Sequence, residues 1–183
     1  MSSTNTVWVH GNAFLAEDPD RLKAIWSQHA NPALPPPIHR VGWGTYFRAE
    51  GLFTWFHISI PVPHDDGIFD PVLETIYFLY EVKAATIMNV DVYDGKKKIY
   101  AFSNLNLAGN PDPINPGIAS GIINGYNSKA INPHISIDTG VGLSIGVQFS
   151  QPLDDHAPSQ VLFTAAGATF GSGLPRTTKP HIP

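Results

Sequence analysis

The chain contains no cysteine, and this absence excludes several kinds of structure and chemistry. Its 183 residues can form neither disulfide bonds nor thiolate metal sites, and no cysteine nucleophile is available. A chain of this length is nevertheless large enough to bury a two-layer hydrophobic core without such cross-links. We therefore expect the fold to depend on its core alone.

Charge is also scarce. Only 14% of the residues are Asp, Glu, Lys or Arg, and the net charge is −4 at pH 7. A surface of this kind attracts neither nucleic acid nor anionic lipid, so we expect neither as a partner. The only basic run, residues 96–98, follows a predicted turn, and we interpret it as a solvated turn.

Long apolar runs are missing as well. No segment approaches the ~20 apolar residues of a membrane-spanning helix. The first residues, Met-Ser-Ser-Thr-Asn-Thr, lack the basic and apolar regions of a secretory signal. The sequence predicts no membrane span, and the default expectation for its location is the cytoplasm.

What the chain has in quantity is glycine, proline and short stretches of alternating apolar and polar residues. The clearest stretch is residues 86–107, in which alternation runs up to Asp94-Gly95 and resumes after it. The Asp-Gly pair is typical of a tight β-hairpin turn. Alternation with a period of two indicates antiparallel strands with one buried face and one solvated face.

Similar segments recur along the chain. We predict strands at residues 6–10, 40–48, 52–60, 73–82, 86–93, 97–107, 142–149 and 161–170. The second and third of these are expected to pair with each other through a turn near Glu50-Gly51. Strands at this spacing predict an all-β fold, an antiparallel β-sandwich of jelly-roll type that forms a single domain over residues 1–173.

Three segments depart from the strand pattern. Asp18-Pro19 is a typical helix start, and it opens an insertion at about residues 18–38 that comprises one short helix and a stiff polyproline arm. Residues about 110–133 are rich in Asn, Pro and Gly and predict the longest loop. Residues 174–183 form a polar C-terminal tail, which is the second Pro-rich arm.

The motif Trp-x-His occurs twice on predicted strands, and it provides the candidate ligand-binding residues. A period of two places the Trp and the His of each motif on one face. If the strands are neighbours, one surface gathers Trp8, His10, Trp43, Trp55 and His57. Such a surface could stack on sugar rings, be buried against another subunit, or be covered by the predicted helix.

Two acidic loops, each with a histidine, are the candidate metal sites. They contain His64, Asp65 and Asp66 (followed by Asp70), and Asp154, Asp155 and His156. Carboxylates and imidazole are metal ligands, but neither loop has the alternating carboxylates of a calcium loop. Because Asp is common in turns for its own hydrogen bonding, we predict no metal and no cofactor.

Small residues occupy two of the late strands. Gly142 and Gly146 lie in one, and Ala165, Ala166, Gly167 and Ala168 lie in the other. Glycine weakens a strand unless another group approaches its backbone closely. The pattern therefore indicates either tight packing within the chain or a subunit contact.

Four sequence blocks resemble an uncharacterised family of small bacterial and fungal all-β proteins. They are Val-Trp-Val-His-Gly-Asn-Ala at residues 7–13, Gly-Trp-Gly-Thr at 42–45, Trp-Phe-His-Ile-Ser-Ile-Pro at 55–61 and Val-Tyr-Asp-Gly at 92–95. The resemblance implies no catalytic residues, because no activity is assigned to the family. It suggests that the helix and polyproline arm are an insertion in this chain.

These features favour a non-enzymatic structural protein that assembles into a homo-oligomer through its low-charge surfaces and Pro-rich arms. The alternative is a carbohydrate-binding, lectin-like module that binds glycans with the Trp and His residues or with the loop at residues 110–133. We identify no catalytic residues and predict that the chain is not an enzyme.

Overall fold

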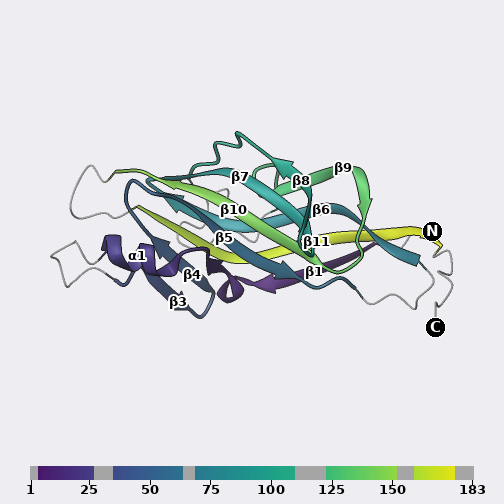
Figure 1. Ribbon diagram of the computed structural model, residues 1–183, viewed down its shortest axis with the longest axis horizontal. Coiled ribbons are helices and arrows are strands. Elements are labelled where there is room, and N and C mark those ends of the chain that lie inside the picture. The colour runs from purple at the N-terminus through teal and green to yellow at the C-terminus, as the bar shows by residue number, and fades with distance from the viewer. Residues whose placement is uncertain (1–3, 27–34, 64–68, 110–122, 152–158, 176–183) are drawn as a thin grey trace.

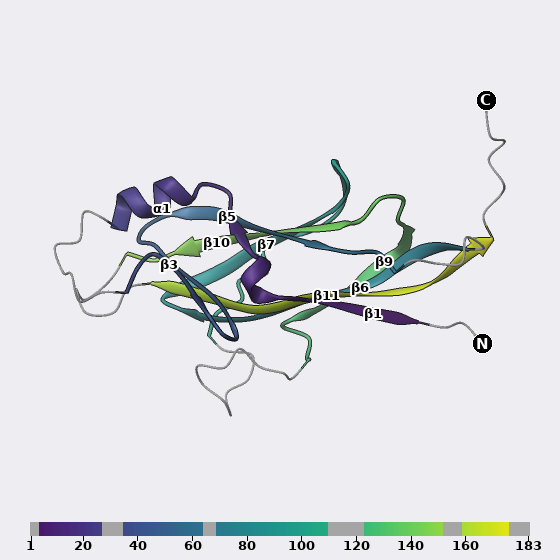
Figure 2. The ribbon, with the colours of Figure 1, turned by 90° about the horizontal axis from the view of Figure 1, so that it is seen from below.

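The computed structural model is a two-layer antiparallel β-sandwich, as the alternation of the sequence predicts, and its described residues include one short α-helix (Figure 1). The structure describes residues 4–26, 35–63, 69–109, 123–151 and 159–175. Figure 2 shows the two layers from the side, with β5, β7 and β10 in one and β1, β6 and β11 in the other.

Sheet A is built around its longest strand, β11. Its six strands are β1 (Asn5–His10), β3 (Ile38–Val41), β4 (Gly44–Arg48), β6 (Phe69–Lys83), β9 (Ser128–Ser136) and β11 (Gln160–Pro175). β6 pairs with one edge of β11, and β4 and then β1 pair with the other edge. β3 lies beyond β4, and β9 lies beyond β6.

Sheet B has five strands in the order β2-β5-β10-β7-β8. They are β2 (Leu15–Ala16), β5 (Phe53–Ile60), β7 (Ala85–Asp94), β8 (Lys97–Phe102) and β10 (Val141–Phe149). β10 is the central strand and pairs with β5 on one side and β7 on the other.

The core lies between the sheets because each strand turns its apolar residues inward. The Phe56 ring on β5 lies 4.5 Å from the Phe47 ring on β4 and 5.6 Å from the Phe163 ring on β11, measured between centroids. All three side chains are buried. The large aromatic side chains of both sheets therefore form one shared core.

The predicted hairpin at Asp94-Gly95 is confirmed. β7 and β8 pair as an antiparallel ladder on either side of this turn, and Gly95 has a φ of +56°. Past β8, Leu107 forms an isolated bridge to Ile87, so the returning segment stays beside β7. Glycine is favoured at this turn because a side chain disfavours positive φ.

The predicted helix start is also confirmed. In α1 (Pro19–Trp26) the Arg21 N–H donates to Asp18 Oδ1 at 2.9 Å, so Asp18 is the N-cap. Leu22 is fully buried in the core, and the helix lies at one end of the sandwich (Figure 2). No helix among the described residues is long and apolar enough to cross a membrane.

The end of the polyproline arm is bound to the sandwich by one arginine. The Arg48 backbone N–H donates to the Pro37 carbonyl at 2.8 Å, and Arg48 Nη1 donates to the Pro36 carbonyl at 2.9 Å. Residues 27–34, which contain the rest of the predicted insertion, lie outside the described residues.

The predicted pairing of residues 40–48 with residues 52–60 is wrong. The first segment is itself a hairpin, in which β3 and β4 meet at Gly42-Trp43. β4 then joins sheet A and β5 joins sheet B, so the chain crosses between the layers after Arg48. Gly44 allows the start of β4 to lie close to β11, since a Cβ at this position would be only 2.3 Å from the Phe163 carbonyl oxygen of β11.

Two predicted boundaries also differ from the structure. β9 begins at Ser128, so residues 128–133 are strand rather than loop, and residues 110–122 lie outside the described part. Pro133 fits β9 because this is an edge strand with an irregular register, where a missing N–H is tolerated. β11 continues to Pro175, past the predicted start of the tail at residue 174.

Candidate functional site

The structure places the two Trp-x-His motifs on different sheets. Trp8 and His10 lie on β1 of sheet A, whereas Trp55 and His57 lie on β5 of sheet B. In each strand the residues between and beside them pack against the core, so both pairs face outward, on opposite sides of the sandwich. Trp43 lies in the β3–β4 turn of sheet A. The five candidate residues therefore do not share one surface.

On sheet A, Trp8 packs against its own chain. Its ring centroid lies 5.2 Å from that of Tyr77, and its indole covers Gly167, where an added Cβ would lie 2.8 Å from the ring. Of the two explanations for the small residues of β11, packing within the chain therefore accounts for Gly167. The indole remains 42% exposed.

His10 has a local structural role. Its Nδ1 accepts a hydrogen bond of 3.1 Å from the Asn12 N–H and so caps the 3-10 turn η1 (Gly11–Ala13). The Asn12 side chain in turn donates to the Val41 carbonyl and accepts from the Thr45 hydroxyl. This network joins the end of β1 to the β3–β4 hairpin.

On sheet B, the strand register brings three polar residues side by side. Ser144 on β10 lies opposite His57 on β5 and opposite Asp91 on β7. His57 Nδ1 and Ser144 Oγ share a hydrogen bond of 2.8 Å. Asp91 Oδ2 lies 2.5 Å from Lys98 Nζ on β8, and this interaction raises the pKa of the Lys98 ammonium.

Over residues 142–146 the central strand carries one side chain on this outer face, the buried Ser144, and the exposed Gln148 follows further along β10. Gly142 and Gly146 flank Ser144, and the three residues form a low strip between the side chains of β5 and β7. One end is closed, because a Cβ on Gly146 would lie 2.8 Å from the Phe53 ring and 3.1 Å from the Trp55 ring. At Gly142 the nearest atom would be 3.6 Å away, on Tyr93, so this end is open.

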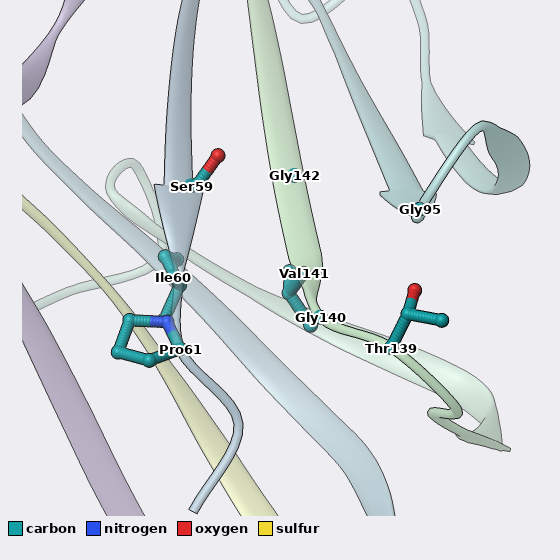
Figure 3. Close-up of a pocket in the computed structure, with 8 residues that line it drawn as sticks. All are labelled: Ser59, Ile60, Pro61, Gly95, Thr139, Gly140, Val141 and Gly142. Carbon is teal, nitrogen blue, oxygen red and sulfur yellow. The ribbon is translucent and has the colours of Figure 1, made fainter.

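The open end of the strip leads into a hollow of about 430 Å³. Its lining residues come from the end of β5, the start of β10 and the turns beside them: Ser59, Ile60, Pro61, Gly95, Thr139, Gly140, Val141 and Gly142. Figure 3 shows Ser59 and Gly142 on neighbouring strands, with Gly95 and Thr139 on the far side.

Asp94 joins the two turns that line this hollow, the β7–β8 turn and the β9–β10 turn. Its carboxylate accepts hydrogen bonds from the Asp138 and Thr139 N–H groups, both at 2.9 Å, and from the Thr139 hydroxyl at 2.6 Å. The Gly140 N–H adds a longer one of 3.3 Å. Burial by itself would raise the pKa of Asp94, but the hydrogen bonds outweigh it and lower the pKa below its usual range.

Residues 142–146 read Gly-Leu-Ser-Ile-Gly, which matches the Gly-x-Ser-x-Gly pattern of hydrolase nucleophiles and was missed in our sequence analysis. The structural context differs, because that motif needs its serine on a sharp turn between a strand and a helix, whereas Ser144 lies inside β10. The order of residues differs too: Ser144 lies between His57 and Asp91, so the carboxylate cannot orient the imidazole as in a catalytic triad.

The candidate metal ligands are not brought together by the described residues. Both acidic loops, with His64, Asp65, Asp66, Asp154, Asp155 and His156, lie outside the described part of the chain. Asp70 lies in β6. Among the residues that the structure describes, no group of three or more His, Asp or Glu side chains could hold a metal ion.

Comparisons with protein-family models, with curated proteins and with solved structures found no match to this chain.

Proposed function

We propose that this chain is a non-enzymatic carbohydrate-binding module, the second of the two functions that its sequence suggests. The ligand lies on the outer face of sheet B, along β10, from the rings of Phe53 and Trp55 to the hollow beside Gly140. The observation that carries the proposal is the strip of Gly142, Ser144 and Gly146, which has aromatic and hydrogen-bonding side chains along both sides.

The chemistry of this strip suits a sugar. Aromatic rings pack against the apolar faces of pyranose rings, and Trp55 and Tyr93 flank the strip on β5 and β7. The His57–Ser144 pair and the Ser59 and Thr139 hydroxyls can exchange hydrogen bonds with sugar hydroxyls.

The charge and length of the strip further limit the class of sugar that fits. The carboxylate of Asp91 is already paired with Lys98, so this pair presents no net charge to a ligand. Between Gly142 and the rings that cover Gly146 the open strip is at most about 13 Å long at the usual rise of a strand, and the hollow extends it. A neutral oligosaccharide fits this shape better than a single sugar.

The proposal is tested by filling the strip. On a glycan array the protein should bind a neutral oligosaccharide, and calorimetry should then show at least tenfold weaker binding for Gly142→Val and Trp55→Ala. Gly142→Val should fold, because an added Cβ makes only ordinary contact at this position. Trp8→Ala, on the opposite sheet, is the matched control and should bind normally. Absence of any glycan ligand, or normal binding by Gly142→Val, would exclude the site.

Self-association, the function that the sequence favours first, stays a second proposal. It is favoured by two large apolar side chains of sheet A that remain exposed, Trp8 at 42% and Trp43 at 53%. Both lie away from the proposed glycan strip of sheet B. The two functions therefore use different surfaces and can be tested separately.

A further inference from the structure

β1 lies at an open edge of sheet A. Its six residues, Asn5–His10, pair with β11 on one side, and no described strand pairs with the other side (Figure 1). An open edge presents a row of backbone N–H and C=O groups that can pair with another strand. Its Val7 and Val9 pack against the core, so the strand is held in an extended form ready for pairing.

The other open edges among the described residues carry features that oppose pairing. β8 contains Lys97 and Lys98, β9 contains Lys129 and Pro133, and β3 contains Arg40. β2 is only two residues long. Edge lysines, prolines and short edge strands are the usual means by which β proteins prevent edge-to-edge association.

β1 has none of these features. It contains no Asp, Glu, Lys, Arg, Pro or Gly, and its central residues Val7, Trp8 and Val9 all favour β structure. The indole of Trp8 lies over Gly167 and packs against Tyr77 on β6, so it leans away from the open edge and does not block the backbone of β1. The contrast with β3, β8 and β9 is the reason to assign a partner to this edge.

We propose that β1 pairs antiparallel with β1 of a second copy of this chain. A two-fold axis perpendicular to sheet A makes the identical edges complementary and continues the sheet from one copy into the other. Directly opposite residues of an antiparallel pair point to the same face of the sheet. The axis must therefore pass beside one residue, which then lies opposite its own copy, and the two central choices are Val7 and Trp8. Either register places the valines of both strands on the inner face and both Trp8 side chains on the outer face.

A pair of short strands buries little surface, so the dimer is weak and exchanges with monomer. The first test therefore captures the dimer covalently, by disulfide cross-linking. The chain lacks cysteine, which makes single-cysteine variants unambiguous. At the two-fold axis the opposed Cα atoms lie about 4.5–5.5 Å apart, within the range that a disulfide spans.

Under mild oxidation, either Val7→Cys or Trp8→Cys should give at least tenfold more disulfide-linked dimer than Ala101→Cys. Ala101 is the matched control, because it is exposed on β8, the lysine-protected edge strand of sheet B. Equal cross-linking of all three variants, or of none, would overturn the proposal.

Sedimentation of the cysteine-free chain provides the second measurement. The wild-type sedimentation coefficient should rise with concentration, whereas Thr6→Lys should stay monomeric with an unchanged far-UV spectrum. Wild-type protein that does not associate, or a Thr6→Lys variant that associates equally, contradicts β1 pairing. Glycan binding per chain should be the same in both proteins, so failure here leaves the proposed function of sheet B intact.

Discussion

Asp94 connects two turns that are distant in sequence. Its carboxylate accepts bonds from three consecutive backbone N–H groups, residues 138–140, while Asp94 itself ends β7. The side chain thereby fixes the β9–β10 turn against the β7–β8 turn, and both turns line the hollow. A sequence pattern can indicate a turn at Asp94-Gly95, but it cannot show that the carboxylate holds a second turn 44 residues away.

We expect Asp94→Asn to lower the free energy of unfolding at pH 7 by about 1–2 kcal/mol, because an amide replaces a charged acceptor of several hydrogen bonds. The folded state lowers the pKa of Asp94, so this stabilisation is complete above the unfolded-state pKa of about 4 and is lost as the pH falls through the folded-state pKa. Urea unfolding at a series of pH values measures the difference.

The matched control is Asp138→Asn, an exposed carboxylate in the same turn whose backbone N–H, not its side chain, bonds to Asp94. It should change stability much less at pH 7. If the gap between wild type and Asp94→Asn stays constant from pH 7 to about pH 2, the carboxylate of Asp94 does not provide the stabilisation.

The β7–β8 hairpin is the element that the sequence describes most completely. Its alternation, its turn residues and its positive φ all depend on residues that are close together in the chain. Gly95 is constrained twice, since its φ is +56° and a Cβ would lie 2.8 Å from Thr139 Oγ1. Only the first of these constraints is visible in the sequence.

We expect Gly95→Val to destabilise the protein by roughly 1–3 kcal/mol, because a β-branched residue is strained at positive φ. Gly95→Asn should be less harmful, since Asn adopts the left-handed region more readily. Gly140→Val in the neighbouring turn is the control, because a Cβ there meets nothing within 4 Å. Thermal denaturation ranks the three variants, and equal midpoints for the two valine variants would contradict the assigned turn.

At the scale of the whole molecule, the two sheets share one core and the chain crosses between them early. β1 belongs to sheet A and β2 to sheet B, and the turn at Gly11 joins them. This turn is packed against β11 so closely that a Cβ on Gly11 would lie 2.1 Å from the Phe163 carbonyl oxygen. A change at Gly11 therefore acts on the central strand of sheet A and, through the core, on sheet B.

We expect Gly11→Ala to cost about 1–3 kcal/mol, because it overpacks a close backbone contact. Far-UV circular dichroism and tryptophan fluorescence should report the same lowered denaturation midpoint, as in cooperative unfolding of a single domain. Gly42→Ala, where a Cβ meets nothing within 4 Å, should unfold like wild type. Separate transitions for the two probes would show that the sheets do not unfold as one unit.

The sequence by itself determined the features that depend on near neighbours. The fold class follows from period-two alternation, the hairpin from Asp94-Gly95, and the helix start from Asp18-Pro19. In each case the residues that decide the local conformation lie within a few positions of one another, so their preferences can be read without knowing the fold.

Only the tertiary structure decided which strands are neighbours. Alternation shows that Trp8 and Trp55 face outward, but not that they belong to different sheets. Likewise the Gly-x-Ser-x-Gly pattern draws attention to Ser144, but it does not identify the hydrogen-bond partner of this residue. That partner, His57, is 87 positions away, and it is brought beside Ser144 by the pairing of β5 with β10. The physical reason is that an antiparallel edge accepts many strands of similar pattern, and packing of the whole core selects among them.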